Sequence, residues 1–282
     1  MQELFSALMR FPSVAGTFYD SNKENLKKEI ENYISKAKES EELKALIKRD
    51  TVGIVSPHAG YTYSGWIAGY SYATLIDEKA SFVIIGPNHT GRGSMVALSK
   101  EDWSTPLGIV KNDREIGNSI KRNSKMIDFD ETAHTFEHSI EVQIPFLQTI
   151  FKNPKVVEIC VSFQNYEVAK DLGNAIYQAE KETRKSIIVI ASSDFTHFEP
   201  AKDAKEKDMR AIKYIEKLDP ESFVNLIESE GMSICGYAPI AAAMIFAKNK
   251  NAKAKLLKYG NSGDVTGDYS SVVGYGSLCF YK

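Results

Sequence analysis

The stretch Ser81-Phe-Val-Ile-Ile-Gly-Pro-Asn-His89 is an apolar, β-branched run that ends in a Gly-Pro pair and a histidine. Such a run predicts a buried strand, and the Gly-Pro pair predicts a sharp turn directly after it. Apolar runs at 52–56 and 186–191 are likewise followed by a histidine, His58 after Pro57 and His197 after Ser192-Ser193-Asp194. Open α/β sheets bind ligands at the carboxyl ends of their strands, so the three turns predict one site at one sheet edge.

The rest of the chain alternates between strand-like and helix-like segments. Strands are expected near 52–56, 81–85, 94–99, 107–111, 155–161, 186–191, 254–259 and 271–281. Helices are expected near 23–40, 64–76, 113–122, 137–151, 166–183, 201–217, 220–230 and 237–249. This alternation predicts an α/β/α sandwich with a mixed, largely parallel central sheet. Since no composition shift or linker interrupts it, residues 1–282 are expected to form a single domain.

Composition limits the expected location and partners. The chain has 43% apolar and 26% charged residues, which is ordinary for a globular protein. A net charge of −2 without a basic block gives no reason to expect nucleic acid or an anionic membrane as a partner. There is no membrane-length apolar run or signal-peptide pattern, and three cysteines are too few for a disulfide framework, so a cytoplasmic location is expected. The oligomeric state is left open.

His58, His89 and Cys235 are the candidate metal ligands. Each lies in a loop rich in Gly or Pro, where the backbone can turn sharply and expose one side chain. Two imidazoles and a thiolate suit a transition metal, with Fe(II) or copper favoured and zinc a further candidate. Taken alone, each is also explained as a hydrogen-bonded loop residue, but the repeated placement favours a shared site. Three protein ligands leave coordination positions open for a small molecule, as in catalytic metal sites.

His197 follows the acidic and hydroxylic run Ser192-Ser193-Asp194 at the end of a predicted strand. Asp194 could orient the imidazole and raise its basicity, which is what a general acid/base requires. In the alternative interpretation, Asp194 caps a turn or the next helix and His197 is simply exposed. Asp194 and His197 are therefore the candidate catalytic pair.

The segment His134-Thr-Phe-Glu137-His138 matches the H-x-x-E-H pattern of inverted zinc proteases. That function requires a helix through all five positions, whereas Thr132-Ala-His-Thr is typical of the lead-in to a helix that starts later. We therefore expect Glu137, His138 and Glu141 to form the polar start of an apolar helix. Four residues are expected to line a substrate pocket: Tyr61, Tyr63, His138 and Glu141.

Taken in order, these motifs resemble the Memo family along nearly the whole chain. The matching segments are Pro12-Ser-Val-Ala-Gly-Thr-Phe-Tyr19, Pro57-His-Ala-Gly-Tyr61, Gly86-Pro-Asn-His89, Glu137-His-Ser-Ile-Glu141, Ser192-Ser-Asp-Phe-Thr-His197, Cys235-Gly and Val273-Gly-Tyr275. The Memo family is in turn similar in fold to the class III, LigB-like extradiol dioxygenases, which contain non-haem iron. The resemblance therefore implies a single α/β/α domain.

The resemblance also implies roles for particular residues. His58, His89 and Cys235 match the Memo metal triad, and His197 matches the acid/base histidine of the dioxygenases, with Asp194 beside it. Dioxygenases carry a carboxylate where Cys235 stands, and a thiolate changes the reduction potential and is itself open to oxidation. The implied function is thus an Fe(II)- or copper-binding redox protein acting on an unknown small molecule or peptide, and ring cleavage is not assumed.

Two other classes of function stay open. In the first, the protein is a non-catalytic module that binds a peptide or phosphopeptide in a vestigial active-site cleft, with or without metal. In the second, the same ligands hold redox-inert zinc and the protein is a hydrolase whose turnover does not depend on O2.

Overall fold

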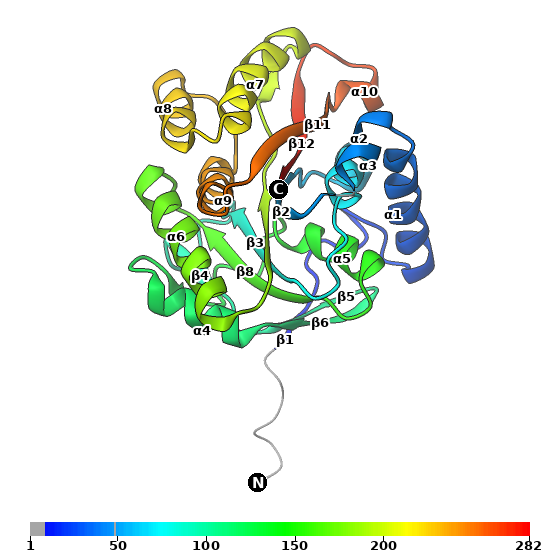
Figure 1. Ribbon diagram of the computed structural model, residues 1–282. Coiled ribbons are helices and arrows are strands. Elements are labelled where there is room, and N and C mark those ends of the chain that lie inside the picture. Colours follow the sequence, from blue (N-terminus) through cyan, green and yellow to red (C-terminus); the bar gives the residue numbers. More distant parts are fainter. Residues whose placement is uncertain (1–8, 48) are drawn as a thin grey trace.

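A computed structural model describes residues 9–47 and 49–282. The described strands form a twelve-stranded sheet with helices on both faces (Figure 1). At its centre lie four parallel strands in the order β8 (Lys155–Val161), β3 (Ser81–Pro87), β9 (Ile187–Ser192) and β2 (Thr51–Ser56). Nearly all of their residues are buried, as expected for strands covered on both faces. The predicted α/β/α fold with a mixed, largely parallel sheet is confirmed.

Antiparallel and short strands extend the sheet on both sides of this centre. Next to β2 lies β12 (Val272–Tyr281), which pairs antiparallel with β2, β11 (Lys253–Asn261) and β10 (His197–Glu199). On the β8 side lie β4 (Val96–Leu98), β6 (Gly108–Asn112), β5 (Asp102–Thr105), β1 (Met9–Arg10) and β7 (Asp128–Phe129). The carboxyl ends of β3, β9 and β2 are neighbours, at the edge where the sequence predicts a site.

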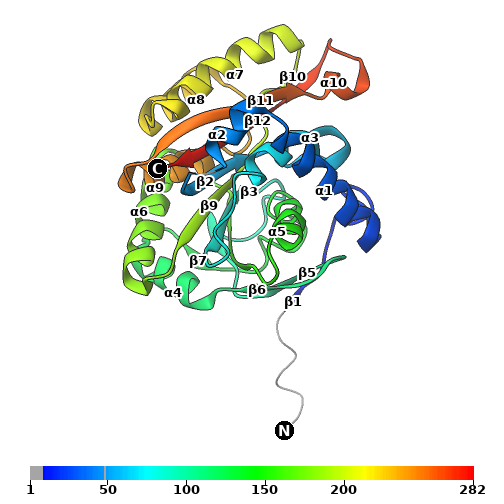
Figure 2. The same ribbon diagram turned by 45° about the vertical axis from the view of Figure 1, so that its right-hand side comes forward.

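Two groups of helices cover the sheet (Figures 1 and 2). One face carries α4 (Arg114–Asn123), α6 (Tyr166–Thr183), α9 (Tyr237–Asn249), α7 (Ala201–Glu216) and α8 (Pro220–Glu230). The other carries α1 (Lys23–Lys38), α2 (Glu41–Leu46), α3 (Tyr61–Tyr72) and α5 (Ile144–Ile150). The short helices η1 (Glu141–Gln143) and α10 (Gly263–Thr266) lie in connections. Within the described residues, no helix combines the length and the apolar character needed to cross a membrane.

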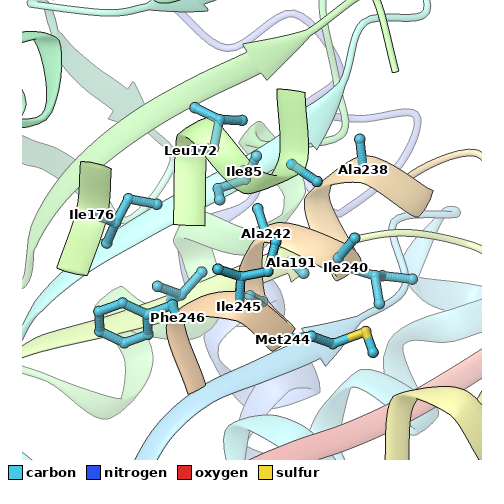
Figure 3. Packing of buried hydrophobic residues seen from close by; sticks show 14 of the residues in the cluster. Ile85, Leu172, Ile176, Ala191, Ala238, Ile240, Ala242, Met244, Ile245 and Phe246 are labelled. Carbon is cyan, nitrogen blue, oxygen red and sulfur yellow. The ribbon is translucent and has the colours of Figure 1, made fainter. Parts of the chain in front are cut away.

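Helix α9 is apolar nearly all round and packs against the neighbouring helix α6 and against the sheet strands β9, β2 and β3 (Figure 3). Gly173 on α6 permits the close approach, because a Cβ there would lie 2.7 Å from the carbonyl oxygen of Ala242. Phe246 and Ile176 fill the space further along the two helices and are completely buried. Burying such side chains stabilises the fold by about 1.5–3 kcal/mol each.

The helix predicted near 137–151 is wrong in its first part. Residues 137 and 138 are irregular and 139–140 form a turn, so helical structure begins only with η1 and continues as α5. The polar groups of this segment have partners elsewhere: the Glu137 carboxylate accepts the N–H of Ser139 (2.8 Å), and the Ser139 hydroxyl donates to the Pro87 carbonyl (2.8 Å). Strand β10 was not predicted: His197 is its first residue, in a segment where no strand was expected.

Candidate functional site

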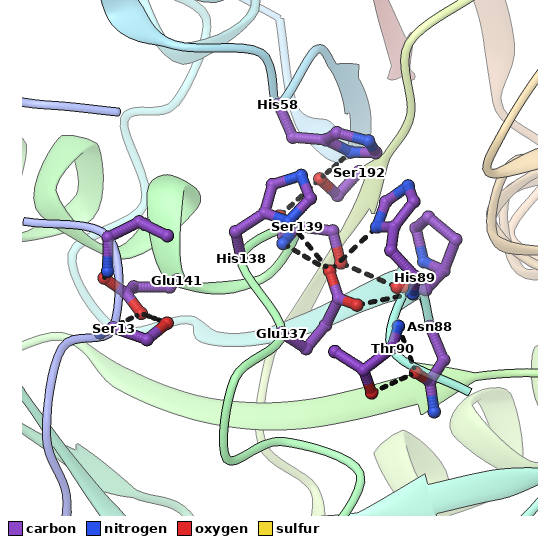
Figure 4. Close-up of polar contacts among 12 residues, drawn as sticks. Ser13, His58, Asn88, His89, Thr90, Glu137, His138, Ser139, Glu141 and Ser192 are labelled. Carbon is purple, nitrogen blue, oxygen red and sulfur yellow. Dashed lines mark hydrogen bonds and ion pairs between the residues drawn. The ribbon is translucent and has the colours of Figure 1, made fainter. Parts of the chain in front are cut away.

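Three imidazole rings converge at the predicted sheet edge (Figure 4). His58 follows β2, His89 follows β3, and His138 lies in the segment 134–143, termed the site loop below. One ring nitrogen from each residue lies within 4.8 Å of the others. Because metal–nitrogen bonds are about 2.0–2.1 Å long, small ring movements would bring three such atoms onto one ion.

A buried hydrogen-bond network around Ser192 fixes the ring of His58. The Ser192 hydroxyl donates to the carbonyl of Ser139 (2.6 Å) and accepts from Gln143 Nε2 (2.8 Å). Its oxygen also lies 2.9 Å from His58 Nδ1. Since the hydroxyl proton is already used, His58 Nδ1 must be the donor, and the lone pair of the ring is on Nε2. That nitrogen faces the sulfur of Cys235 at 3.1 Å.

Glu137 fixes His89 at two points. One carboxylate oxygen accepts the backbone N–H of His89 (2.5 Å), and the other accepts from His89 Nδ1 (2.9 Å). A carboxylate can only accept, so the proton of the neutral ring is on Nδ1 and the lone pair is on Nε2. Burial alone would raise the pKa of Glu137, but the hydrogen bonds from His89 and Ser139 lower it to about 2. The carboxylate is therefore ionised at neutral pH.

The rings of His58 and His138 are held in the neutral form that binds metals. Burial lowers the pKa of His58 well below its ordinary value, and the neighbouring His89 and His138 lower it further. Burial also lowers the pKa of His138, although Glu137 partly opposes the shift. Neutral imidazole is the metal-binding form of histidine, so the site does not have to lose protons from these two rings when an ion binds.

Cys235 lies in the loop that leads into α9, and its sulfur contacts His58. Its Sγ also accepts the backbone N–H of Asp194 at 3.2 Å. Gly236 lets this loop approach β9, because a Cβ there would lie 2.5 Å from the Ser192 carbonyl oxygen. Burial and the charge of Asp194 raise the pKa of the thiol, so binding as a thiolate requires a metal ion to displace the proton. The group of mutually close donor atoms among the described residues consists of the three imidazoles, with the sulfur next to His58.

Asp194 and His197 lie close to this group but are not paired as the sequence suggested. The Asp194 carboxylate accepts the backbone N–H of His58 (2.8 Å), and burial raises its pKa to about 6. His197 Nδ1 instead donates to the carbonyl of Ser233 (2.8 Å), and its backbone N–H donates to the Ser233 hydroxyl (2.8 Å). His197 is half-buried and keeps its lone pair on Nε2, as a proton acceptor requires.

The four residues expected to line a substrate pocket have different surroundings. His138 is part of the imidazole group, whereas Tyr61 is buried and donates its hydroxyl to the Val142 carbonyl (2.6 Å). Tyr63 is 43% exposed. Glu141 is completely buried, and its carboxylate binds the N-terminal segment through Arg10, Ser13, Val14 and Tyr19.

The H-x-x-E-H segment does not form the helical frame of a protease. Residues 134–136 form a turn and 137–138 are irregular, so His134 and His138 do not share a helix face. His134 is completely buried, with its ring edge-on to Trp103 at 5.6 Å between centroids. The imidazole group contains His138 and excludes His134.

The groups that orient the rings are the part that sequence reasoning missed. Ser192 and Glu137 lie inside motifs that stood out, but their partners on other segments could not be read from the pattern. Gln143 and Ser233 had no signal beyond being polar residues near those motifs.

The fold and the site define an α/β protein with a histidine-rich site at the carboxyl edge of its parallel strands. The chain belongs to the Memo family, because the family model described as Memo-like protein matches residues 10–279. A MEMO1 family protein from Methanosarcina acetivorans is 45% identical over 273 residues, which cover 96% of this chain and 98% of the relative. One from Saccharolobus islandicus is 43% identical over 277 residues, covering 95% and 98%.

A solved structure supports the fold at a greater distance. It is that of an uncharacterised protein from Escherichia coli K12, with a TM-score of 0.54 and 12% identity. The match covers 80% of this chain and 98% of that protein. At this identity the likeness concerns the architecture and carries no functional argument.

Proposed function

We propose that this chain is a metal-dependent redox protein in which His58, His89 and Cys235 hold Fe(II) or copper. The proposal rests on the way hydrogen bonds already orient the metal-binding atoms. His58 and His89 each have Nδ1 bound to a buried acceptor, which leaves Nε2 available, and the sulfur of Cys235 is 3.1 Å from one of these nitrogens. Metal-binding histidines in proteins typically have this second hydrogen bond.

The donor set suits these ions. Two imidazoles and a sulfur favour soft or borderline transition metals over Mg2+ or Ca2+, and zinc also fits. A bound ion would supply Lewis-acid and electron-transfer chemistry. Family membership supports the same assignment, because the match over residues 10–279 includes all three positions and the motifs around them resemble those of the Memo family. A reducing cytoplasmic location belongs to the proposal, since the thiol ligand has to stay reduced.

His197 is the proposed acid/base. Its Nδ1 is tied to the Ser233 carbonyl, so Nε2 is the nitrogen that can take up or release a proton next to the metal ligands. Asp194 holds the backbone of His58 and contributes negative charge close to the His58 ring. The molecule acted upon is an unidentified small molecule or peptide.

The metal content of protein purified without oxygen tests this proposal. We expect close to one iron or copper per chain, and a large loss of metal in Cys235→Ser with the fold retained by circular dichroism. Protein that never retains iron, copper or zinc under any loading condition would contradict the proposal and would favour the peptide-binding module. Stoichiometric zinc with O2-independent turnover would favour the hydrolase.

A further inference from the structure

We propose that Glu137 is a positioning residue that aligns His89 and His138 on one metal ion, so that His138 serves as a third imidazole ligand. The inference rests on the proposed metal-binding function. It adds to the set of His58, His89 and Cys235 a further ligand, His138, and a nearby negative charge, that of Glu137.

The partners of Glu137 are unusual for a completely buried carboxylate. Among residues 9–47 and 49–282, the basic side chains that contact its carboxylate are those of His89 and His138, with no lysine or arginine on it. Arg10 passes close by but donates to the backbone carbonyl of Glu137 (2.7 Å) and forms its ion pair with Glu141. A buried negative charge without a cationic partner is costly, and a metal ion bound by the two imidazoles would offset that cost.

One carboxylate serves both rings. Glu137 Oε1 lies 2.9 Å from His89 Nδ1 and 3.5 Å from His138 Nδ1. The two rings are stacked, with centroids 4.6 Å apart and planes inclined by 23°. In Figure 4 both rings turn one nitrogen towards Glu137 and the other towards the side of His58. The anion accepts a hydrogen bond from His89. Its charge acts on His138 at the longer distance and favours a proton on the near nitrogen of that ring as well.

The three rings bring their donor nitrogens close enough to share one ion. One nitrogen from each of His58, His89 and His138 lies within 4.8 Å of the others. A cation bound among them would be attracted to all three lone pairs. The negative charge of Glu137 would also offset one of the two positive charges of a divalent ion, and a Cys235 thiolate would offset the other.

Glu137→Gln tests the positioning role, because it keeps the size of the side chain and removes its charge. We expect the affinity for Zn(II), measured in competition with a chelator, to fall by about 10–100-fold. His138→Gln should lower it by a similar factor and shift the d–d absorption bands of the Co(II)-loaded protein. Glu158→Gln is the matched control, because Glu158 is also a completely buried acid but its side chain binds Asn112. It should bind Zn(II) like the unmodified protein.

The unmodified protein offers a test that needs no variant. In the metal-free state, histidine 15N NMR should show the His89 proton on Nδ1, and Glu137→Gln should lose that single tautomer. A His89 proton on Nε2, or Zn(II) affinity unchanged in Glu137→Gln, would overturn the positioning role. Unchanged affinity and spectrum in His138→Gln would overturn the third imidazole. Unmodified protein that binds no metal but shows the expected tautomer would contradict the proposed function and leave the role of Glu137 in ring orientation intact.

Discussion

The helix pair α6–α9 and the site loop are held by different kinds of interaction, although both connect to the same parallel strands. Between α6 and α9 the contacts are apolar, and Gly173 lets the two helices approach closely. In the site loop the contacts are hydrogen bonds of polar side chains. Glu137 binds His89, Ser139 binds the carbonyl of Pro87, and Gln143 binds Ser192. The α6–α9 contact therefore contributes mainly to stability, whereas the hydrogen bonds of the site loop mainly orient the imidazole rings. Stability and metal binding should be separable by mutation.

Phe246→Ala should have the largest effect and should act on stability. The side chain is completely buried in the α9 region, and such a truncation lowers the free energy of unfolding by about 3–5 kcal/mol. Urea denaturation measures the loss. The folded variant should still bind Zn(II) with unmodified affinity, and a parallel fall in affinity would show that the two regions are coupled.

The buried acids Glu137 and Glu158 have pKa values that are shifted in opposite directions. Partners lower the pKa of Glu137 to about 2, whereas burial raises the pKa of Glu158 on β8 to about 8. A raised carboxyl pKa means that the folded state holds the proton more tightly than the unfolded state. The contribution of Glu158 to stability is thus complete below pH 4.5 and is lost as pH rises to about 8.

Glu158→Gln should remove that dependence. Each proton linked to unfolding contributes a slope of up to about 1.4 kcal/mol per pH unit. Urea midpoints measured from pH 5 to pH 9 should fall less steeply in the variant than in the unmodified protein. Identical slopes in the two proteins would show that Glu158 is not protonated in the fold.

Ser192→Ala should act on metal binding as well as on stability. The change removes the acceptor for His58 Nδ1 and so releases the ring from its tautomer. We expect Zn(II) affinity to fall by about 10–100-fold, and the free energy of unfolding to fall by about 1–3 kcal/mol because buried partners of Ser192 are left unpaired. Calorimetric titration alongside urea denaturation separates the two effects. A large loss of stability with unchanged affinity would reverse the roles assigned to this network.

His197→Gln should have the smallest effect on binding. Its ring is tied to Ser233 and lies outside the group of three imidazoles, so Zn(II) affinity should stay within about threefold of the unmodified value. Any turnover found for the metal-loaded protein should be lost. An affinity change as large as that in Ser192→Ala would instead make His197 a ligand.

The same contrast explains how far the sequence could predict the structure. Apolar periodicity predicted 166–183 and 237–249 as helices, because burial of apolar side chains determines those segments. The recurring strand and turn placed His58 and His89 at one sheet edge, since parallel neighbours align their carboxyl ends. In the site loop the apolar spacing predicted a helix from residue 137. There the polar side chains bind distant groups, and local periodicity does not contain that information.

In the proposed site, two imidazole nitrogens and the sulfur of Cys235 bind one ion. X-ray absorption at the metal edge of the Zn(II)-loaded protein identifies these ligands by atom type and distance. We expect nitrogen neighbours at about 2.0–2.1 Å with the outer-shell pattern of imidazole, and one sulfur at about 2.3 Å that is absent in Cys235→Ser. A spectrum of light-atom neighbours only, identical in both proteins, would contradict the assignment of Cys235 as a ligand.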